Sequence, residues 1–97
     1  MNFNKKVYNL TKKIPKGKVT TYKQIAKKLK TRAYRAVGNA LNKNRDKNVP
    51  CHRVINSNGR VGEFARGTGQ KIRLLRTEGI EIYNNKIDVK KYLYRFR

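Results

Sequence analysis

Two short amphipathic helical patterns lie next to each other in this chain, with a break of only two or three residues between them. Apolar residues spaced three and four apart predict a helix at residues 21–30 and another at residues 31–43. Their apolar faces are Tyr22, Ile25, Ala26 and Leu29 in the first, and Ala33, Ala36, Val37, Ala40 and Leu41 in the second. Thr20 or Thr21 can cap the first helix. Such a pair has the dimensions of a helix-turn-helix, which restricts the chain to folds built around a tight helical corner.

Further helical patterns flank this pair. Phe3, Val7, Leu10 and Ile14 predict a helix that ends near the turn at residues 15–18. A fourth helix is predicted from Thr68 to Glu78, with Ile72 and Leu75 facing inward and Gly79 closing it. The remaining expected elements are short extended segments at Arg53–Ile55 and Arg60–Gly62, and a last helical turn or two after Asp88 that carries Val89, Tyr92 and Phe96. The expected fold is mainly α, a winged helix-turn-helix-like domain with about four to five helices and short extended segments around the active site.

The charge balance indicates the kind of partner. Lys and Arg number 26 against 5 acidic residues, a formal net charge of +21. The basic residues are spread over the whole chain, so one strongly cationic domain spanning residues 1–97 is expected to bind a polyanion, above all nucleic acid. A chain of 97 residues suits one domain, and no linker divides it. A membrane partner is not expected, because no apolar run approaches ~18 residues.

The N-terminus, the single cysteine and the single histidine exclude several classes of protein. The N-terminus lacks the apolar core of a signal peptide, which predicts an intracellular protein of the cytoplasm or nucleoid. A single cysteine permits no internal disulfide, and one cysteine with one histidine cannot complete a zinc site. We expect no metal and no cofactor, and a monomer.

The second helix of the pair has an unusual surface. Small side chains occupy much of it, and Arg35 projects from among them. The small residues are Ala33, Ala36, Gly38, Asn39 and Ala40. A base-reading helix usually carries several long polar side chains, so this one is suited to close approach and to one inserted arginine. Ala36 and Ala40 could equally pack the core.

Cys51 and His52 are the only cysteine and the only histidine, and they are adjacent. A thiolate is a useful nucleophile, and nearby positive charge, here from Arg53 and the cationic domain, favours it. On an extended segment neighbouring side chains point to opposite faces, so His52 would act on Cys51 through a bridging water. A carboxylate should orient His52. The candidates are Glu78, Glu63, Asp46, Glu81 and Asp88, of which Glu78 is preferred because its helix is apolar enough to lie against the site. The alternative is a buried cysteine beside a hydrogen-bonded histidine.

The segment Val49–Val54, with the sequence VPCHRV, resembles the active-site motif of the O6-alkylguanine-DNA alkyltransferases (methylated-DNA–protein-cysteine methyltransferases). Residues 14–22 look like the family's approach to the helix-turn-helix, and RAVGNAL at residues 35–41 looks like its recognition helix. Asn44 is similar to its hinge asparagine. Other residues at the family's spacing are Gly59, Val61, Gly62, Lys71, Leu74, Leu75, Glu78 and Gly79. The resemblance covers about residues 3–80, the C-terminal DNA-binding and active-site domain.

The resemblance implies a DNA repair protein that flips O6-alkylguanine out of duplex DNA from the minor groove and transfers the alkyl group once, irreversibly, to Cys51. Arg35 would fill the vacated space, and Tyr22 would rotate the nucleotide and donate a hydrogen bond to the purine. His52, Glu78 and Asn44 would support Cys51. The other implied DNA-binding residues are Thr21, Ala33, Ala36, Gly38 and Asn39, and the implied substrate pocket is Leu41, Val54, Phe64, Ala65 and Arg66.

Three departures from the family pattern affect these expectations. Most members carry an N-terminal domain ahead of the first helix, and none is expected here. Residues 45–48 (RDKN) replace an apolar, proline-bearing stretch that lines the alkyl pocket, and they are one residue shorter. Phe64 stands where tyrosine is frequent, and Arg66 where a small residue is common. Pocket size and DNA contacts should differ accordingly.

Two other functions are compatible with a basic helix-turn-helix. An alkyltransferase-like protein would recognise the lesion and recruit other repair factors without transfer. Such relatives are short, as this chain is, but they usually lack the cysteine, so Cys51 favours transfer. A transcription factor would bind undamaged DNA by sequence, which the small surface of residues 33–40 disfavours.

Overall fold

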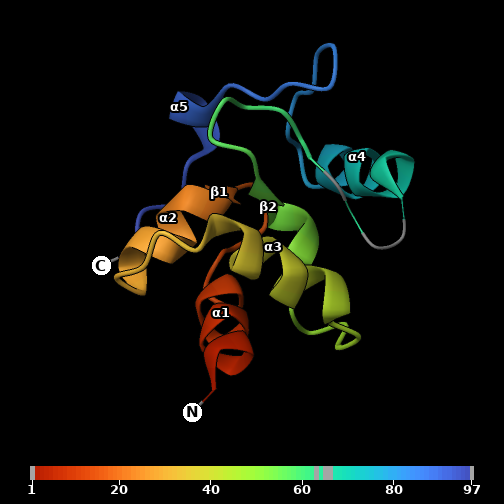
Figure 1. Ribbon diagram of the computed structural model, residues 1–97. Coiled ribbons are helices and arrows are strands. Elements are labelled where there is room, and N and C mark those ends of the chain that lie inside the picture. The colour runs from red at the N-terminus through yellow and green to blue at the C-terminus, as the bar shows by residue number, and fades with distance from the viewer. Residues whose placement is uncertain (1, 63, 65–66, 97) are drawn as a thin grey trace.

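The computed structural model describes residues 2–62, 64 and 67–96, and it confirms the mainly helical, helix-turn-helix-like fold (Figure 1). The helices are α1 (Phe3–Thr11), α2 (Tyr22–Lys28), α3 (Tyr34–Lys43), the 3-10 helix Cys51–Arg53, α4 (Thr68–Thr77) and α5 (Val89–Tyr92). The strands are β1 (Thr20–Thr21) and β2 (Val54–Ile55). Within the described residues, none of the helices is long and apolar enough to cross a bilayer.

The first half of the chain is a three-helix unit in which α1 and α2 both pack on α3. Its core is made of the apolar faces that the periodicity predicts, and Val54 of β2 joins it. The buried members are Val7, Leu10, Ile14, Ile25, Ala26, Val37, Ala40, Leu41 and Val54. Because α3 is covered on one side by α1 and α2, its opposite face is left open.

A second core lies on the other side of the short sheet. Strands β1 and β2 pair in parallel, with Thr20 opposite Val54 and Thr21 opposite Ile55. Apolar residues of the sheet, of α4 and of the C-terminal segment gather there: Val19, Ile55, Val61, Leu75, Ile80, Ile82, Ile87 and Tyr92. The C-terminal segment then runs beside β1, where Val19 donates to the Tyr92 carbonyl (2.9 Å) and Tyr94 donates to the Val19 carbonyl (2.7 Å). The segment containing Cys51 therefore sits between two cores.

The predicted helix signals of α2 and α4 are confirmed. Thr21 caps α2, since its Oγ1 accepts from the backbone N–H of Gln24 at 3.0 Å. Gly79 follows α4 with φ +89°, a left-handed conformation that favours glycine. The expected helical turn after Asp88 is α5.

Two predicted helix boundaries are wrong. Helix α1 ends at Thr11 rather than near residue 15, because Lys13 and Ile14 switch to bonds with the carbonyls three residues back. Ile14 is nevertheless buried. Helix α3 begins at Tyr34, so residues 29–33 separate the two helices. In that segment Thr31 Oγ1 accepts from the Ala33 N–H at 3.1 Å, a local turn that delays the helix.

The backbone at Cys51 also differs from the prediction. Residues 51–53 form a 3-10 helix, not an extended segment, so Arg53 belongs to this turn rather than to the strand. The amide of Cys51 donates to the Val49 carbonyl (2.8 Å) and that of Arg53 to the Pro50 carbonyl (3.0 Å). The fixed φ of Pro50, −79°, suits the start of such a turn. Neighbouring side chains of a 3-10 turn also point in different directions, so Cys51 and His52 face apart here as well.

Candidate active site

Cys51 begins the 3-10 helix directly after Pro50, and its side chain is held by the end of α3. Asn44, the C-cap of α3, donates from Nδ2 to the sulfur at 3.2 Å. The thiol reaches the Leu41 carbonyl at 3.7 Å. Asn44 also bonds Asp46 through both of its side-chain groups, at 3.0 and 3.1 Å. One asparagine therefore fixes the turn after α3 and points a donor at the nucleophile, where it can stabilise a thiolate.

His52, Arg53 and Glu78 form one hydrogen-bonded unit. His52 Nε2 lies 2.9 Å from Glu78 Oε2. Arg53 donates to both carboxylate oxygens, from Nε to Oε1 at 2.9 Å and from Nη2 to Oε2 at 2.7 Å. Its Nη1 donates to the Ile14 carbonyl at 2.7 Å. The bidentate pair thus positions Glu78, and Glu78 orients the imidazole.

The electrostatics of this unit favour a neutral histidine. Burial lowers the pKa of His52, although its hydrogen bond to Glu78 opposes the change. Burial would raise the pKa of Glu78, but the hydrogen bonds from Arg53 and His52 outweigh it and hold that pKa below its usual range. Arg53 is therefore the counter-ion of Glu78. Because a carboxylate only accepts hydrogen bonds, neutral His52 carries its proton on Nε2, which leaves Nδ1 free to take another.

Lys71 is the most unusual charged residue of the structure, because its side chain is fully buried. Its Nζ donates to the hydroxyl of Tyr22 at 3.4 Å and lies 5.7 Å from the centre of that ring. Burial lowers the pKa of Lys71 to about 7, while the nearby Cys51 acts in the opposite direction. A lysine in this range can give and take a proton at neutral pH. Tyr22, Lys71 and Cys51 are thereby electrostatically connected.

Most of the predicted site residues line one of two hollows. A hollow of about 470 Å³ opens beside Cys51 and contains Leu41, Asn44, His52 and Phe64. Residues 45–48 form part of its wall, so this departure from the family pattern does lie at the cysteine pocket. Lys12 and Arg45 bring cations to the same wall.

The other hollow, of about 730 Å³, lies along the open face of α3. Tyr22, Arg35, Gly38 and Asn39 line it, opposite the turn at residues 56–58. Its charged lining residues, among those described, are basic. The face predicted for DNA is therefore a groove, and two of the predicted small residues, Gly38 and Asn39, are in its lining.

Four further predicted site residues lie elsewhere. The side chain of Thr21 is occupied by the cap of α2, and Val54 is fully buried in the core, so only their backbones can contribute. Ala33 is exposed at the start of α3, and Ala36 is half-buried. Of the two alanines for which core packing was the alternative, Ala40 does lie in the core. The predicted pocket residues Ala65 and Arg66 fall outside the described residues.

The sequence reasoning missed two members of the site. Arg53 was taken only as nearby positive charge, whereas it is the clamp of Glu78. Lys71 was noted only as one of the residues at the spacing of the alkyltransferase family. Its signal was available, since the apolar face of α4 that contains Leu75 also contains Lys71, four residues earlier. Of the other candidate carboxylates, Asp46 lies in the wall of the Cys51 hollow, but its Oδ1 accepts from the Asn48 N–H. Glu81 is exposed and pairs with Lys91, and Asp88 is the N-cap of α5. Glu63 falls outside the described residues.

The fold and site define a small basic helix-turn-helix protein with a cysteine held next to a histidine–carboxylate pair. Residues 2–80 match the family model described as 6-O-methylguanine DNA methyltransferase, DNA binding domain. The chain belongs to this family.

Three similar proteins place the chain within it. A bifunctional methyltransferase/endonuclease of Picrophilus torridus is 46% identical over 90 residues, which are 91% of this chain and 30% of that protein. A methylated-DNA–protein-cysteine methyltransferase of Sulfolobus acidocaldarius is 49% identical over 82 residues, 84% of this chain and 52% of the relative. The chain thus spans about half or less of these curated relatives. The structure of S. pombe Atl1 in complex with damaged DNA containing O6-carboxymethylguanine superposes with a TM-score of 0.87 at 34% identity, covering 97% of this chain and 95% of Atl1.

Proposed function

We propose that this protein repairs O6-alkylguanine in duplex DNA by a single, irreversible transfer of the alkyl group to Cys51. The observation that carries the proposal is the position of the sulfur, 3.2 Å from the Asn44 amide and in a hollow shared with His52, beside the basic groove of α3. A cysteine kept only for packing would not need a donor aimed at its sulfur and an oriented, neutral base nearby.

The transfer is a displacement at the alkyl carbon. His52 Nδ1 takes the thiol proton of Cys51 through a bridging water, and the sulfur attacks the carbon. The C–S bond forms as the bond between that carbon and O6 breaks, and the electron pair remains on the guanine. Glu78 and Arg53 stabilise the imidazolium that results. A thioether is a very poor leaving group, so each molecule reacts once.

The guanine that leaves must be neutralised. Tyr22 is the proposed donor to the purine, and Lys71 donates to its hydroxyl. Because the pKa of Lys71 is about 7, this lysine can supply the proton that Tyr22 gives up. In this scheme Tyr22 and Lys71 serve as the acid for the guanine, and Cys51 serves as the nucleophile.

Duplex DNA is the proposed partner. The small residues of α3 would allow its backbone to approach the minor groove, and Arg35 would occupy the space of the flipped nucleotide. The net charge of +21 supplies phosphate contacts. Support for this choice comes from the DNA-binding description of the family and from the DNA complex of Atl1.

Intact-mass measurement after incubation with a duplex that contains O6-methylguanine tests the proposal. We expect a gain of one methylene mass, about 14 Da, on one site per molecule, and peptide mapping should place it on Cys51. The control duplex carries guanine at the same position and should leave the mass unchanged. A series of larger O6-alkyl groups would then measure the pocket that residues 45–48 have altered.

Lesion recognition without transfer is the second candidate function. The match to Atl1 favours this second function, because the match extends over almost the whole of both chains. An unchanged mass together with tight, lesion-specific binding would establish this function and exclude transfer. Tight binding to undamaged DNA of one particular sequence would exclude both.

The buried lysine makes a separate prediction about stability. An unfolded lysine has a pKa near ~10.4, whereas the pKa of folded Lys71 is about 7. Between these values the unfolded chain binds more protons, so the free energy of unfolding should rise with pH, by up to about 1.4 kcal/mol per pH unit. The Lys71→Met variant should lack this rise. Urea unfolding of both proteins from pH 6 to 10 measures the difference, and parallel curves would show that Lys71 keeps an ordinary pKa.

A further inference from the structure

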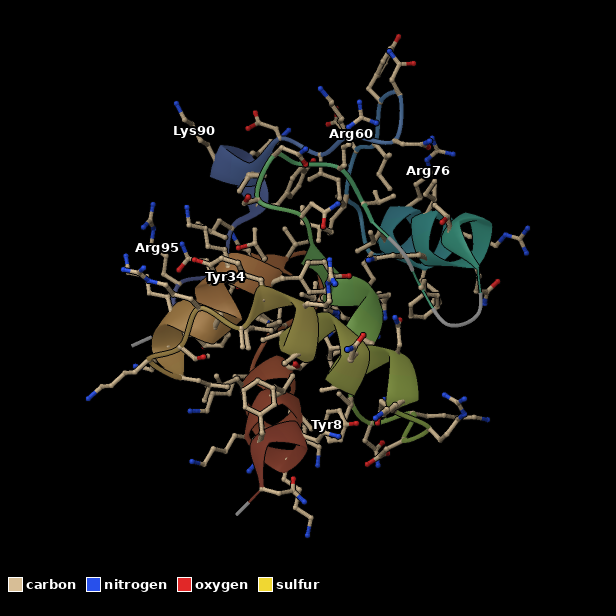
Figure 2. All side chains as sticks on the ribbon, viewed as in Figure 1. Tyr8, Tyr34, Arg60, Arg76, Lys90 and Arg95 are labelled. Atoms are coloured by element: carbon tan, nitrogen blue, oxygen red, sulfur yellow. The ribbon has the colours of Figure 1, made fainter. Side chains whose placement is uncertain are left out.

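Tyr34 is the exception on the small-residue face of α3. It is the first residue of the helix, directly before Arg35, and 44% of its side chain is exposed. The other exposed large apolar side chain among the described residues is Tyr83, 84% exposed on the C-terminal segment. Figure 2 labels Tyr34, which lies at the start of α3. An exposed aromatic ring therefore lies at the start of a helix whose surface between Arg35 and Lys43 consists of alanine, glycine and asparagine.

The ring of Tyr34 lies between two basic hollows. One is the groove of about 730 Å³ that also contains Tyr22 and Arg35. The other, of about 340 Å³, is lined by Lys23, Lys27, Lys30, Thr31, Arg32 and Tyr34. Each charged residue described in either lining is a lysine or an arginine. If DNA phosphates bind along both hollows, the Tyr34 ring would lie above the groove between the two DNA strands.

The geometry of a helix separates the directions of Tyr34 and Arg35. Consecutive residues are rotated by about 100° around the helix axis, so the two side chains, although both line the larger groove, leave the helix in different directions. A minor groove about 6 Å wide admits a tyrosine ring edge-on, and apolar side chains inserted there unstack base steps and widen the groove.

We propose that Tyr34 is a second intruding side chain, which packs against the bases and deoxyriboses flanking the lesion and holds the minor groove open beside Arg35. The proposal rests on the proposed binding of duplex DNA to α3, but not on alkyl transfer. Its energetic contribution is apolar and aromatic, because the flanking cations already supply the phosphate contacts.

The test compares Tyr34→Ala with Tyr34→Phe, Arg35→Ala and Tyr83→Ala, each in a Cys51→Ser background so that binding reaches equilibrium. Affinity for a duplex containing O6-methylguanine is measured across a salt series, and 2-aminopurine next to the lesion reports unstacking. Tyr34→Ala should bind about 5- to 100-fold more weakly and unstack the probe less. Its salt slope should be unchanged, whereas that of Arg35→Ala should fall by about 1. Tyr34→Phe should recover most of the affinity, and Tyr83→Ala should lose none.

Several outcomes would overturn the proposal: wild-type affinity in Tyr34→Ala, an equal loss in Tyr34→Phe, or an equal loss in Tyr83→Ala. Reaction with free O6-methylguanine base, measured with Cys51 intact, separates this idea from the proposed function. If Tyr34→Ala loses duplex affinity but the wild type never gains an alkyl group, Tyr34 keeps its role and transfer is refuted. If Tyr34→Ala slows the free-base reaction as much as the duplex reaction, the intruding role is wrong.

Discussion

Replacing Cys51 by serine should abolish alkyl transfer, lowering the rate by at least about 10⁴-fold, while lesion-specific DNA binding remains. Serine keeps a small polar side chain within reach of Asn44 and the Leu41 carbonyl, so the fold and the hollow should persist. It removes the nucleophile, because a hydroxyl is hardly ionised near neutral pH and a thiol is appreciably so. Intact mass after overnight incubation with the O6-methylguanine duplex measures the loss.

The controls for this variant identify the acceptor atom. Circular dichroism and unfolding in urea should match the wild type closely, which separates lost chemistry from lost structure. A methyl group that still appears on Cys51→Ser would contradict the assignment. Peptide mapping would then examine Lys71 first, because a lysine with a pKa of about 7 holds a substantial fraction of neutral amine close to the same hollow.

The local parts of the fold follow from the sequence. Thr21 marks the start of α2, because its side-chain oxygen caps the helix. Gly79 marks the end of α4, because it adopts a positive φ. Both signals act within one helical turn, so neighbouring residues are sufficient to predict them. The core faces of α1, α2 and α3 follow from spacing alone, because burial of one stripe is what stabilises such short helices.

The parts that were not predicted, or were predicted with wrong bounds, depend on contacts distant in sequence or on competing local bonds. The pairing of β1 with β2 joins residues 20–21 to residues 54–55, and each strand is too short to show an alternating pattern. The end of α1 and the start of α3 depend on turns that use Thr11 and Thr31 as hydrogen-bonding partners. Propensity does not distinguish these turns from a continued helix.

The candidate site likewise contains one contact that could be inferred from the sequence and two features that could not. The pairing of His52 with Glu78 was inferred by considering which of five acidic residues could reach the histidine, and the structure places the two side chains 2.9 Å apart. The clamp from Arg53 and the burial of Lys71 could not be inferred like this. Each depends on how α4 lies against the 3-10 helix, a tertiary contact that no local pattern records.

Glu78 is the residue whose loss should affect both chemistry and stability. In Glu78→Gln the side-chain amide can donate to His52 Nε2, which would move the imidazole proton to Nδ1 and remove the base. Arg53 would also lose its counter-ion, although its bond to the Ile14 carbonyl remains. We expect the rate of Cys51 alkylation to fall about 10²- to 10⁴-fold. The free energy of unfolding should fall by about 2–4 kcal/mol, since a largely buried arginine is left without its carboxylate.

The pH dependence of stability distinguishes this role from a general packing defect. The pKa of Glu78 is lowered in the folded protein, so its contribution to stability is present above the unfolded pKa and is lost as pH falls through the folded one. The lowered pKa of His52 acts in the same direction at somewhat higher pH, because the unfolded histidine takes up its proton first. In addition to the decline that Lys71 causes between about pH 10 and pH 7, wild-type stability should therefore decline further on acidification below about pH 6.5, and more steeply below about pH 4.5. Glu78→Gln should lose the steeper part.

The matched control is Glu81→Gln, which removes the same charge from an exposed carboxylate paired with Lys91. It should change neither the rate nor the acid profile, since an exposed pair contributes little. Equal effects of the two substitutions would mean that Glu78 acts only through the net charge of the domain. A slow reaction in Glu78→Gln with normal stability would keep Glu78 as the residue that orients His52 but would show that the Arg53 pair contributes no net stability. A destabilised variant with an unchanged rate would instead make the cluster structural and leave the base for Cys51 to be sought elsewhere.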